Sequence, residues 1–225
     1  MNKTEILERY ILDPSLKLWL PLAHMDGPAG AASLRSRDAY GLSLTPTGAF
    51  WTPDGWYFDG VDDQITGLEA ATTHLDFTTE DYSMVARIRY DDNSDTQHIV
   101  SRFQWNQSGW ASWASSAGAI QVYTFQAAAN QLSTTPNILV DGCVHTIGFS
   151  RQGASIRVYI DGVDLTLTAG SHVDNVTANR KLGVGHNGYA AAVHLGLIKA
   201  VAIWQRWLSP AQHADMHHRL TEVFG

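Results

Sequence analysis

A compact run of carboxylates in the sequence could bind a metal ion. Asp59, Asp62 and Asp63 lie beside an Asp-Gly pair that follows three aromatic residues. Carboxylate oxygens are the ligands that Ca²⁺ prefers, and it takes about six to eight oxygens. These three residues are therefore candidate calcium ligands, with Asp26 and Asp38 as further donors. In the alternative interpretation, Asp59 is a turn residue, since Asp-Gly between apolar runs is typical of a tight reversal, and Asp62 and Asp63 are solvated.

A second candidate site is aromatic. Trp105, Trp110 and Trp113, together with Tyr123, fall in the middle of the chain. Indole rings stack on the apolar faces of sugars, so these residues are candidates for a glycan site. Because successive residues of a strand face opposite sides, Trp110 and Trp113 must point to different faces, and at most one of them lines a groove. The alternative is that the four residues pack in the core or at an interface.

Patterns typical of catalysis are missing from the sequence. A glycosidase needs two carboxyl groups across a cleft, commonly with glutamate among them. His213 and His217 have the i,i+4 spacing of zinc ligands, but Ala214 stands where a zinc protease needs Glu. His145 alternates with Ile147 and Phe149 on one face of an expected strand, so it is expected to be a hydrogen-bonded core residue. We therefore expect a protein without enzymatic activity. The glutamates, all outside the expected strands, are Glu5, Glu8, Glu69, Glu80 and Glu222.

The charge and the hydropathy of the sequence exclude two classes of partner, nucleic acid and a membrane that the chain would span. The formal net charge is -7, and the lysines and arginines are scattered, which argues against a nucleic-acid partner. No apolar run is long enough to span a membrane. The first nine residues lack the apolar core of a secretory leader, so we expect a protein made in the cytoplasm and either kept there or carried in a virion.

The elements that position these residues are expected to be strands. A hydrophobic content of 44% with only 16% charged residues favours a β-sandwich, formed by one domain over residues 1–225. Residues 82–90 alternate between apolar and polar positions, as a half-buried strand does, whereas residues 196–205 are apolar on both faces and predict a central strand. Residues 127–138 are polar and predict a loop.

Short helices are expected at both ends of the chain. Apolar residues on one face predict a helix within residues 1–13, which Pro14 ends. Ser209 followed by Pro210 and Gln212 is a strong helix start, because Ser caps the first turn and Pro fits its first position. The second helix is predicted over residues 209–221.

Several short motifs follow one another in a distinctive order. Phe58-Asp59-Gly60-Val61-Asp62-Asp63 comes before the strand at 82–90, and Val144-His145-Thr146-Ile147 precedes Val158-Tyr159-Ile160-Asp161-Gly162. Leu182-Gly183-Val184-Gly185 and Val201-Ala202-Ile203-Trp204 come last. In this order and spacing the chain resembles the laminin-G-like, concanavalin A-like jelly-roll family over roughly residues 17–220. The resemblance implies an all-β jelly-roll sandwich of two antiparallel sheets.

The family resemblance also carries functional expectations. It implies binding of glycans or proteins, often with Ca²⁺ at one rim of the sandwich. Two positions depart from the family pattern: Val144 stands where Trp is usual before His145, and residues 196–199 lack the usual acidic pair. The resemblance therefore does not supply further metal ligands.

Two functions remain open at this point. The first is a non-catalytic binding module, with Trp105, Trp110, Trp113 and Tyr123 as the ligand-binding residues and a glycan or protein surface as the partner. The second is a structural or assembly protein, such as a homo-oligomeric decoration or fibre-associated domain of a phage virion, because jelly rolls are common in capsids.

Overall fold

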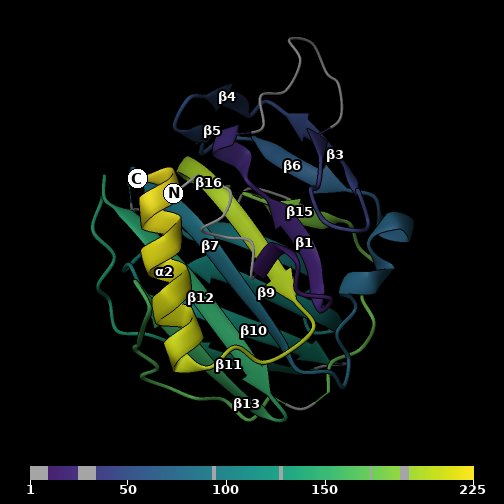
Figure 1. Ribbon diagram of the computed structural model, residues 1–225. Helices are drawn as coiled ribbons and strands as arrows, with labels where there is room; N and C mark the ends of the chain where they lie inside the picture. Colours follow the sequence, from purple (N-terminus) through teal and green to yellow (C-terminus); the bar gives the residue numbers. More distant parts are fainter. Residues whose placement is uncertain (1–9, 25–33, 93–94, 127–128, 173, 188–192) are drawn as a thin grey trace.

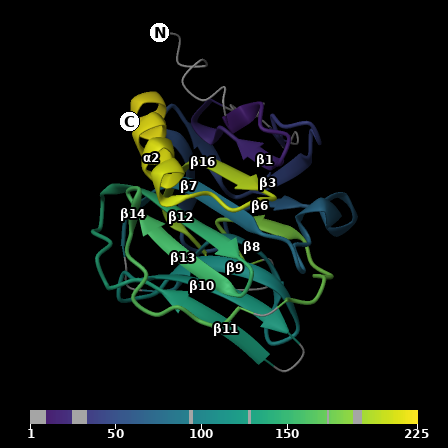
Figure 2. The same cartoon turned by 60° about the horizontal axis from the view of Figure 1, so that its bottom comes forward.

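The computed structural model describes residues 10–24, 34–92, 95–126, 129–172, 174–187 and 193–225. Two antiparallel sheets pack face to face, and one long helix lies against the outer face of one of them (Figure 1). Figure 2 shows that strands from both sheets meet at the end of the sandwich where β10, β11 and β13 lie. This arrangement confirms the expected all-β jelly-roll sandwich.

The first sheet, called sheet A, has the strand order β14-β13-β12-β7-β16-β5-β4, and β1 also pairs with β16. Its strands are β1 (Leu16–Leu20), β4 (Phe50–Thr52), β5 (Gly55–Asp59), β7 (Tyr82–Tyr90), β12 (Val144–Gln152), β13 (Ser155–Ile160), β14 (Val163–Asp164) and β16 (Leu195–Trp204).

The second sheet, called sheet B, has the order β11-β10-β9-β8-β15-β6-β3-β2. Its strands are β2 (Leu34–Arg35), β3 (Ser43–Thr47), β6 (Gln64–Gly67), β8 (Gln97–Gln104), β9 (Ser108–Ala114), β10 (Ile120–Gln126), β11 (Ala129–Thr134) and β15 (Leu182–Val184). Short 3-10 turns occur at η1 (Leu22–His24), η2 (Glu69–Ala71) and η3 (Thr73–Leu75).

Two strands of sheet A confirm the predictions made from periodicity. Strand β7 covers residues 82–90 as expected, and its alternate residues Met84, Ala86 and Ile88 are buried between the sheets. Strand β16 lies between β7 on one side and β5 and β1 on the other, and it is buried on both faces. It needs apolar residues on both faces because sheet B covers one face and the C-terminal helix covers the other.

The C-terminal helix α2 spans Pro210–Phe224. Ser209 caps it as predicted, in a capping box with Gln212. The helix continues beyond the predicted end at residue 221 because Val223 and Phe224 are buried against sheet A. Lys199 also donates hydrogen bonds to the carbonyls of Phe224 (2.8 Å) and Gly225 (3.3 Å), which satisfies groups left open at a helix end. In the described part of the chain, no helix combines the length and apolarity that crossing a membrane requires.

Other expectations at the level of elements were wrong or fall outside the described residues. Residues 129–134, predicted as loop, form β11, which pairs with β10 along its whole length. The neighbouring strand supplies hydrogen-bond partners that outweigh the weak strand preference of these polar residues. The predicted N-terminal helix lies mostly in residues 1–9, outside the described chain, and residues 10–11 are helical.

The buried apolar side chains of the described residues form three clusters. The largest fills the space between the two sheets. The second joins sheet A to helix α2 and includes Trp19, Trp204 and Met216. The third lies on the outer face of sheet B and consists of Phe103, Ala111, Trp113 and Phe125, with Tyr123 packed against it. The four core members of this third cluster are buried, and the ring of Trp105 packs against Trp113 and Phe125.

Candidate functional site

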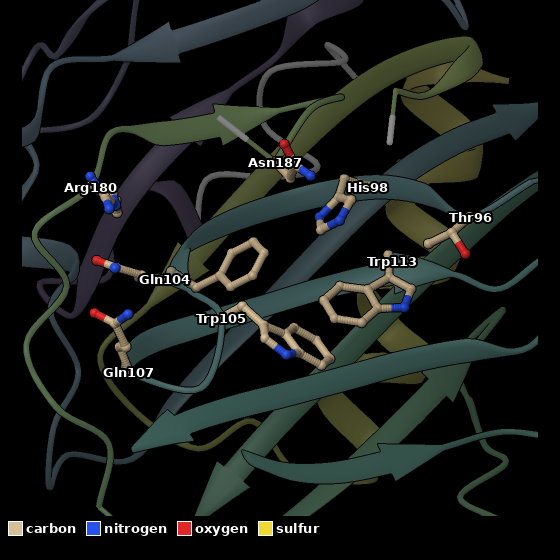
Figure 3. Close-up of a pocket in the computed structure, with 9 residues that line it drawn as sticks. Thr96, His98, Gln104, Trp105, Gln107, Trp113, Arg180 and Asn187 are labelled. Atoms are coloured by element: carbon tan, nitrogen blue, oxygen red, sulfur yellow. The ribbon is translucent and has the colours of Figure 1, made fainter. Parts of the chain in front are cut away.

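A pocket of about 540 Å³ opens on the outer face of sheet B (Figure 3). This volume lies in the range of small-molecule sites. Apolar rings form much of its wall, and amide, hydroxyl and guanidinium groups complete it. We call it the aromatic pocket; its lining residues are Thr96, His98, Phe103, Gln104, Trp105, Gln107, Trp113, Arg180 and Asn187.

Strands β9 and β10 place two of the predicted residues side by side. Trp113 and Tyr123 both point to the outer face of sheet B, and their rings stack with centroids 4.3 Å apart at 19°. The indole N–H of Trp113 donates to the Gln121 side chain at 2.7 Å, which fixes the orientation of the ring. Tyr123 does not line the pocket itself but supports Trp113 from behind.

The turn between β8 and β9 carries the most exposed ring of the four aromatic candidates. Trp105 has 51% of its surface exposed. The turn closes by a hydrogen bond from Gln107 N–H to the carbonyl of Gln104, and Asn106 adopts a left-handed φ of 51° that asparagine tolerates. The Trp105 ring lies 6.2 Å from Trp113 between ring centroids, so the two indoles form an angled surface on which a flat ligand could rest.

An irregularity in β8 brings His98 into the pocket. Val100 is buried between the sheets, so regular alternation would place His98 there too. The pairing of β8 with β9 shifts register between these two residues, and such a bulge re-aims the side chains beside it. His98 consequently stacks on Phe103 at 5.6 Å and lies 4.8 Å from Trp113.

Trp110 does not join the other predicted residues. Its ring is buried between the sheets with 1% of its surface exposed, and its indole N–H donates to the carbonyl of Leu75 at 3.0 Å. The prediction that Trp110 and Trp113 face opposite sides is confirmed, and Trp113 is the one that lines the groove. Of the four aromatic candidates, the structure brings together Trp105, Trp113 and Tyr123, and Trp110 serves as core.

Sequence reasoning missed His98, Phe103, Gln104 and Arg180 as pocket residues. Phe103 follows from strand alternation once the faces of β8 are known. Arg180 lies in a segment without a strand pattern, and no sequence signal places it near Trp105. The segment is held by Arg102, whose guanidinium donates to the carbonyls of Ala178 (3.0 Å) and Arg180 and pairs with Asp76 at 2.9 Å.

The polar side chains among the described residues that line the pocket include no acidic group. Burial lowers the pKa of His98 to about 3, with the nearby His186 contributing, so the imidazole is neutral at ordinary pH. Burial raises the pKa of Tyr123, which keeps its hydroxyl protonated. The wall therefore offers aromatic faces and hydrogen-bonding groups together with the arginine.

The three candidate calcium ligands do come together. One oxygen from each of Asp59, Asp62 and Asp63 lies within 4.8 Å of the others. Burial raises the pKa of Asp63, and the charges of Asp59 and Asp62 raise it further, although a hydrogen bond from Asp59 N–H (2.8 Å) opposes this. Asp59 also accepts from Val61 N–H at 2.8 Å, as a turn residue does.

The acidic group fits Ca²⁺ in ligand type and is incomplete in number. It supplies three of the about six to eight oxygens that the ion takes. Asp38, named as a further donor, directs its two oxygens to the backbone N–H groups of Trp19 and Tyr40. Asp26 lies outside the described residues.

His213 and His217, considered from the sequence as a metal-binding pair, hold helix α2 on sheet A. His213 is buried and hydrogen-bonds through Nε2 to the Ser150 hydroxyl at 2.7 Å. His217 contacts Thr146 at 3.0 Å, and His145 pairs with Asp161 at 2.8 Å. The i,i+4 pair on the helix therefore has a packing role. His145 is hydrogen-bonded as expected, but it is partly buried and not a core residue.

Solved structures of similar fold include a sialidase and a toxin binding domain. A sialidase of Trypanosoma rangeli, in complex with a difluoro sugar acid, superposes with a TM-score of 0.70 at 14% identity, covering 96% of this chain and 34% of the sialidase. The binding domain of botulinum neurotoxin serotype D gives 0.68 at 13% identity, covering 91% of this chain and 50% of that one. The chain thus spans about a third to a half of the length of these two proteins. At this low sequence identity, the similarity shows a shared fold only.

Sequence comparison identifies the family. A search of curated proteins found no match. The family model described as the concanavalin A-like lectin/glucanases superfamily matches residues 59–212. This range contains most of both sheets and the aromatic pocket. The chain therefore belongs to the concanavalin A-like lectin/glucanase superfamily.

Proposed function

We propose that this chain is a non-catalytic carbohydrate-binding module and that the aromatic pocket is its ligand site. The observation that carries the proposal is the pair of angled indoles, Trp105 and Trp113, in a pocket edged by side-chain amides. Sugar rings present apolar faces that stack on indoles and hydroxyl groups that bond to amides. Membership of a lectin-containing superfamily and the fold shared with a toxin binding domain support this reading.

The make-up of the pocket supports binding without hydrolysis. Cleavage of a glycosidic bond uses two carboxyl groups on either side of the bond. No Asp or Glu is among the described residues that line the pocket. The described glutamates, Glu69, Glu80 and Glu222, lie in a 3-10 turn, a bend and helix α2, away from the strands.

A glycan array followed by calorimetry on the best ligand tests the proposal. Trp105→Ala should weaken binding at least about tenfold, which corresponds to ~1.4 kcal/mol, because the exposed indole contributes contact area to the ligand and little to the core. Trp51→Ala is the matched control, since Trp51 is a partly exposed indole on β4 of sheet A.

Two results would contradict this function. One is the absence of binding to any glycan at millimolar concentration. The other is equal loss of affinity in the Trp105 and Trp51 variants, which would place the ligand elsewhere. The assembly function stays a prediction that light scattering tests: a strict monomer at all concentrations would count against it.

A further inference from the structure

The aromatic pocket has an electrostatic character opposite to that of the whole chain. The sequence carries 22 acidic residues against 15 lysines and arginines. The described pocket lining nevertheless contains Arg180 and no carboxylate. Figure 3 shows Arg180, Gln104 and Gln107 at one end of the pocket, with Trp105 and Trp113 beyond them. One end of the site is therefore rich in hydrogen-bond donors, and the rest is aromatic.

The backbone at Arg180 is fixed before any ligand arrives. Arg102 is 1% exposed and donates to the carbonyl of Arg180 as well as to that of Ala178. Asp76 holds Arg102 through two hydrogen bonds of 2.9 Å. Because the backbone is held by a buried, hydrogen-bonded support, the point from which the Arg180 side chain starts does not have to be ordered when a ligand binds, which favours affinity.

A buried imidazole in the same wall also points to a polar ligand. His98 is 4% exposed, and its Nδ1 atom has no hydrogen-bond partner among the described residues. Buried polar atoms are nearly always paired, because an unpaired one loses its hydration without replacement. A hydroxyl group of a ligand in the pocket could supply that pairing after a small shift of the ring.

We propose that the ligand of this pocket is an acidic saccharide, one whose sugar carries a carboxylate. The carboxylate would lie at the Arg180 end beside the two glutamine amides, and the sugar ring would rest against Trp105 and Trp113. Arginine suits this partner because its planar guanidinium donates two parallel hydrogen bonds to a carboxylate. The inference rests on the proposed function and adds the charge of the ligand to it.

Matched ligands that differ only in charge provide the test. Binding of oligomers of galacturonate, glucuronate and mannuronate is measured by calorimetry, each beside its methyl ester, which keeps the ring and removes the charge. We expect at least one acid to bind about 10- to 100-fold more tightly than its ester. Arg180→Met should weaken the acid by a similar factor and leave the ester unchanged, whereas Trp105→Ala should weaken both.

The control for the arginine variant is Arg157→Met, which makes the same charge change on sheet A, where this side chain is 53% exposed. Equal or tighter binding of the esters, or of neutral or sulfated saccharides alone, overturns the inference and leaves the proposed function in place. Failure of every saccharide to bind overturns both. Should Arg180→Met fail to fold, the comparison of acid with ester on the unaltered protein still decides the matter.

Discussion

At the scale of single residues, the Asp63 carboxylate is the most buried of the acidic group, with 3% of the residue exposed. Its pKa is raised by burial and by the charges of Asp59 and Asp62, so the ionised group is disfavoured by its surroundings. A divalent cation would offset the repulsion among the three carboxylates. The fold accommodates the group without the ion because Asp59 and Asp63 also accept hydrogen bonds within the turn.

The calcium hypothesis makes a prediction about thermal stability. At a Ca²⁺ concentration about 100-fold above its Kd, binding should add about 2.7 kcal/mol, or about 5–10 °C in Tm for a chain of this length. Asp62→Asn should abolish the shift. Asp62 is exposed, and the hydrogen bonds of the turn described above are made by Asp59 and Asp63, so its loss affects the ion more than the fold. Differential scanning calorimetry with Ca²⁺ and with Mg²⁺ measures the shift in Tm. An unchanged Tm in 10 mM Ca²⁺ would contradict calcium binding.

Residue by residue, strand alternation explains both what could be predicted for the site and what could not. It placed Trp110 and Trp113 on opposite faces, and it could not say which face was the core. It sends His98 to the wrong side, since the bulge beside Val100 arises from how β8 meets β9. The backbone of Arg180 is held beside the pocket by Arg102, a residue far away in the sequence. No local sequence pattern could therefore predict that Arg180 lines the pocket.

At the scale of elements, helix α2 packs very closely on sheet A at Gly148. A Cβ atom added to Gly148 of β12 would lie 2.6 Å from His213 Nδ1. The imidazole of His213 lies flat against Tyr159, with ring centroids 3.8 Å apart, and bonds to Ser150. Only glycine at position 148 leaves room for this arrangement.

Gly148→Ala should therefore destabilise the protein by about 1–3 kcal/mol, or about 2–10 °C in Tm, because the added methyl group displaces a packed ring. Proteolysis within α2 should also become faster than in the unaltered protein. His213→Ala in the same chain should recover part of the loss, so a double-mutant cycle measured by urea unfolding should show coupling of about 0.5 kcal/mol or more. Additive effects would mean that the two side chains do not compete for this space.

Strand β11 shows why the prediction of a loop over residues 127–138 was wrong. Its inward Ser133 is fully buried, and a buried polar residue argues against a strand when the sequence is read alone. His172, from a segment outside the strands, hydrogen-bonds both Ser133 (2.8 Å) and Thr124 of β10 (2.9 Å). The polar residues of this hairpin are satisfied by a distant histidine, whereas β7 and β16 are stabilised by apolar residues that a periodicity analysis detects.

At the scale of the whole molecule, four buried histidines link folding to pH. Burial lowers the pKa of His98 and His213 to about 3, and that of His172 and His194 to about 4, from the ordinary value of 6.5. They pack in different places: the aromatic pocket, the α2 seat, the β10–β11 hairpin and a site beside Tyr90. Each therefore acts on a different part of the same folded structure.

The sign of the pH effect follows from which state takes up protons. Above about pH 7.5, one unit over the ordinary pKa, these imidazoles are neutral in both states, and the stability that their burial allows is fully present. As the pH falls from 6.5 towards 4, the unfolded chain binds protons that the folded chain excludes, so each histidine can lower the free energy of unfolding by up to about 1.4 kcal/mol per pH unit. Together, these four histidines should make the protein unfold under mild acid.

Urea midpoints measured between pH 7.5 and 4.5 should fall steeply below pH 6.5. His172→Gln should flatten that slope, while His218→Gln, at a side chain that is 72% exposed, should not. A stability that stays constant from pH 7 to pH 5 would contradict this account, because it would mean that the folded and unfolded chains bind the same number of protons over that range.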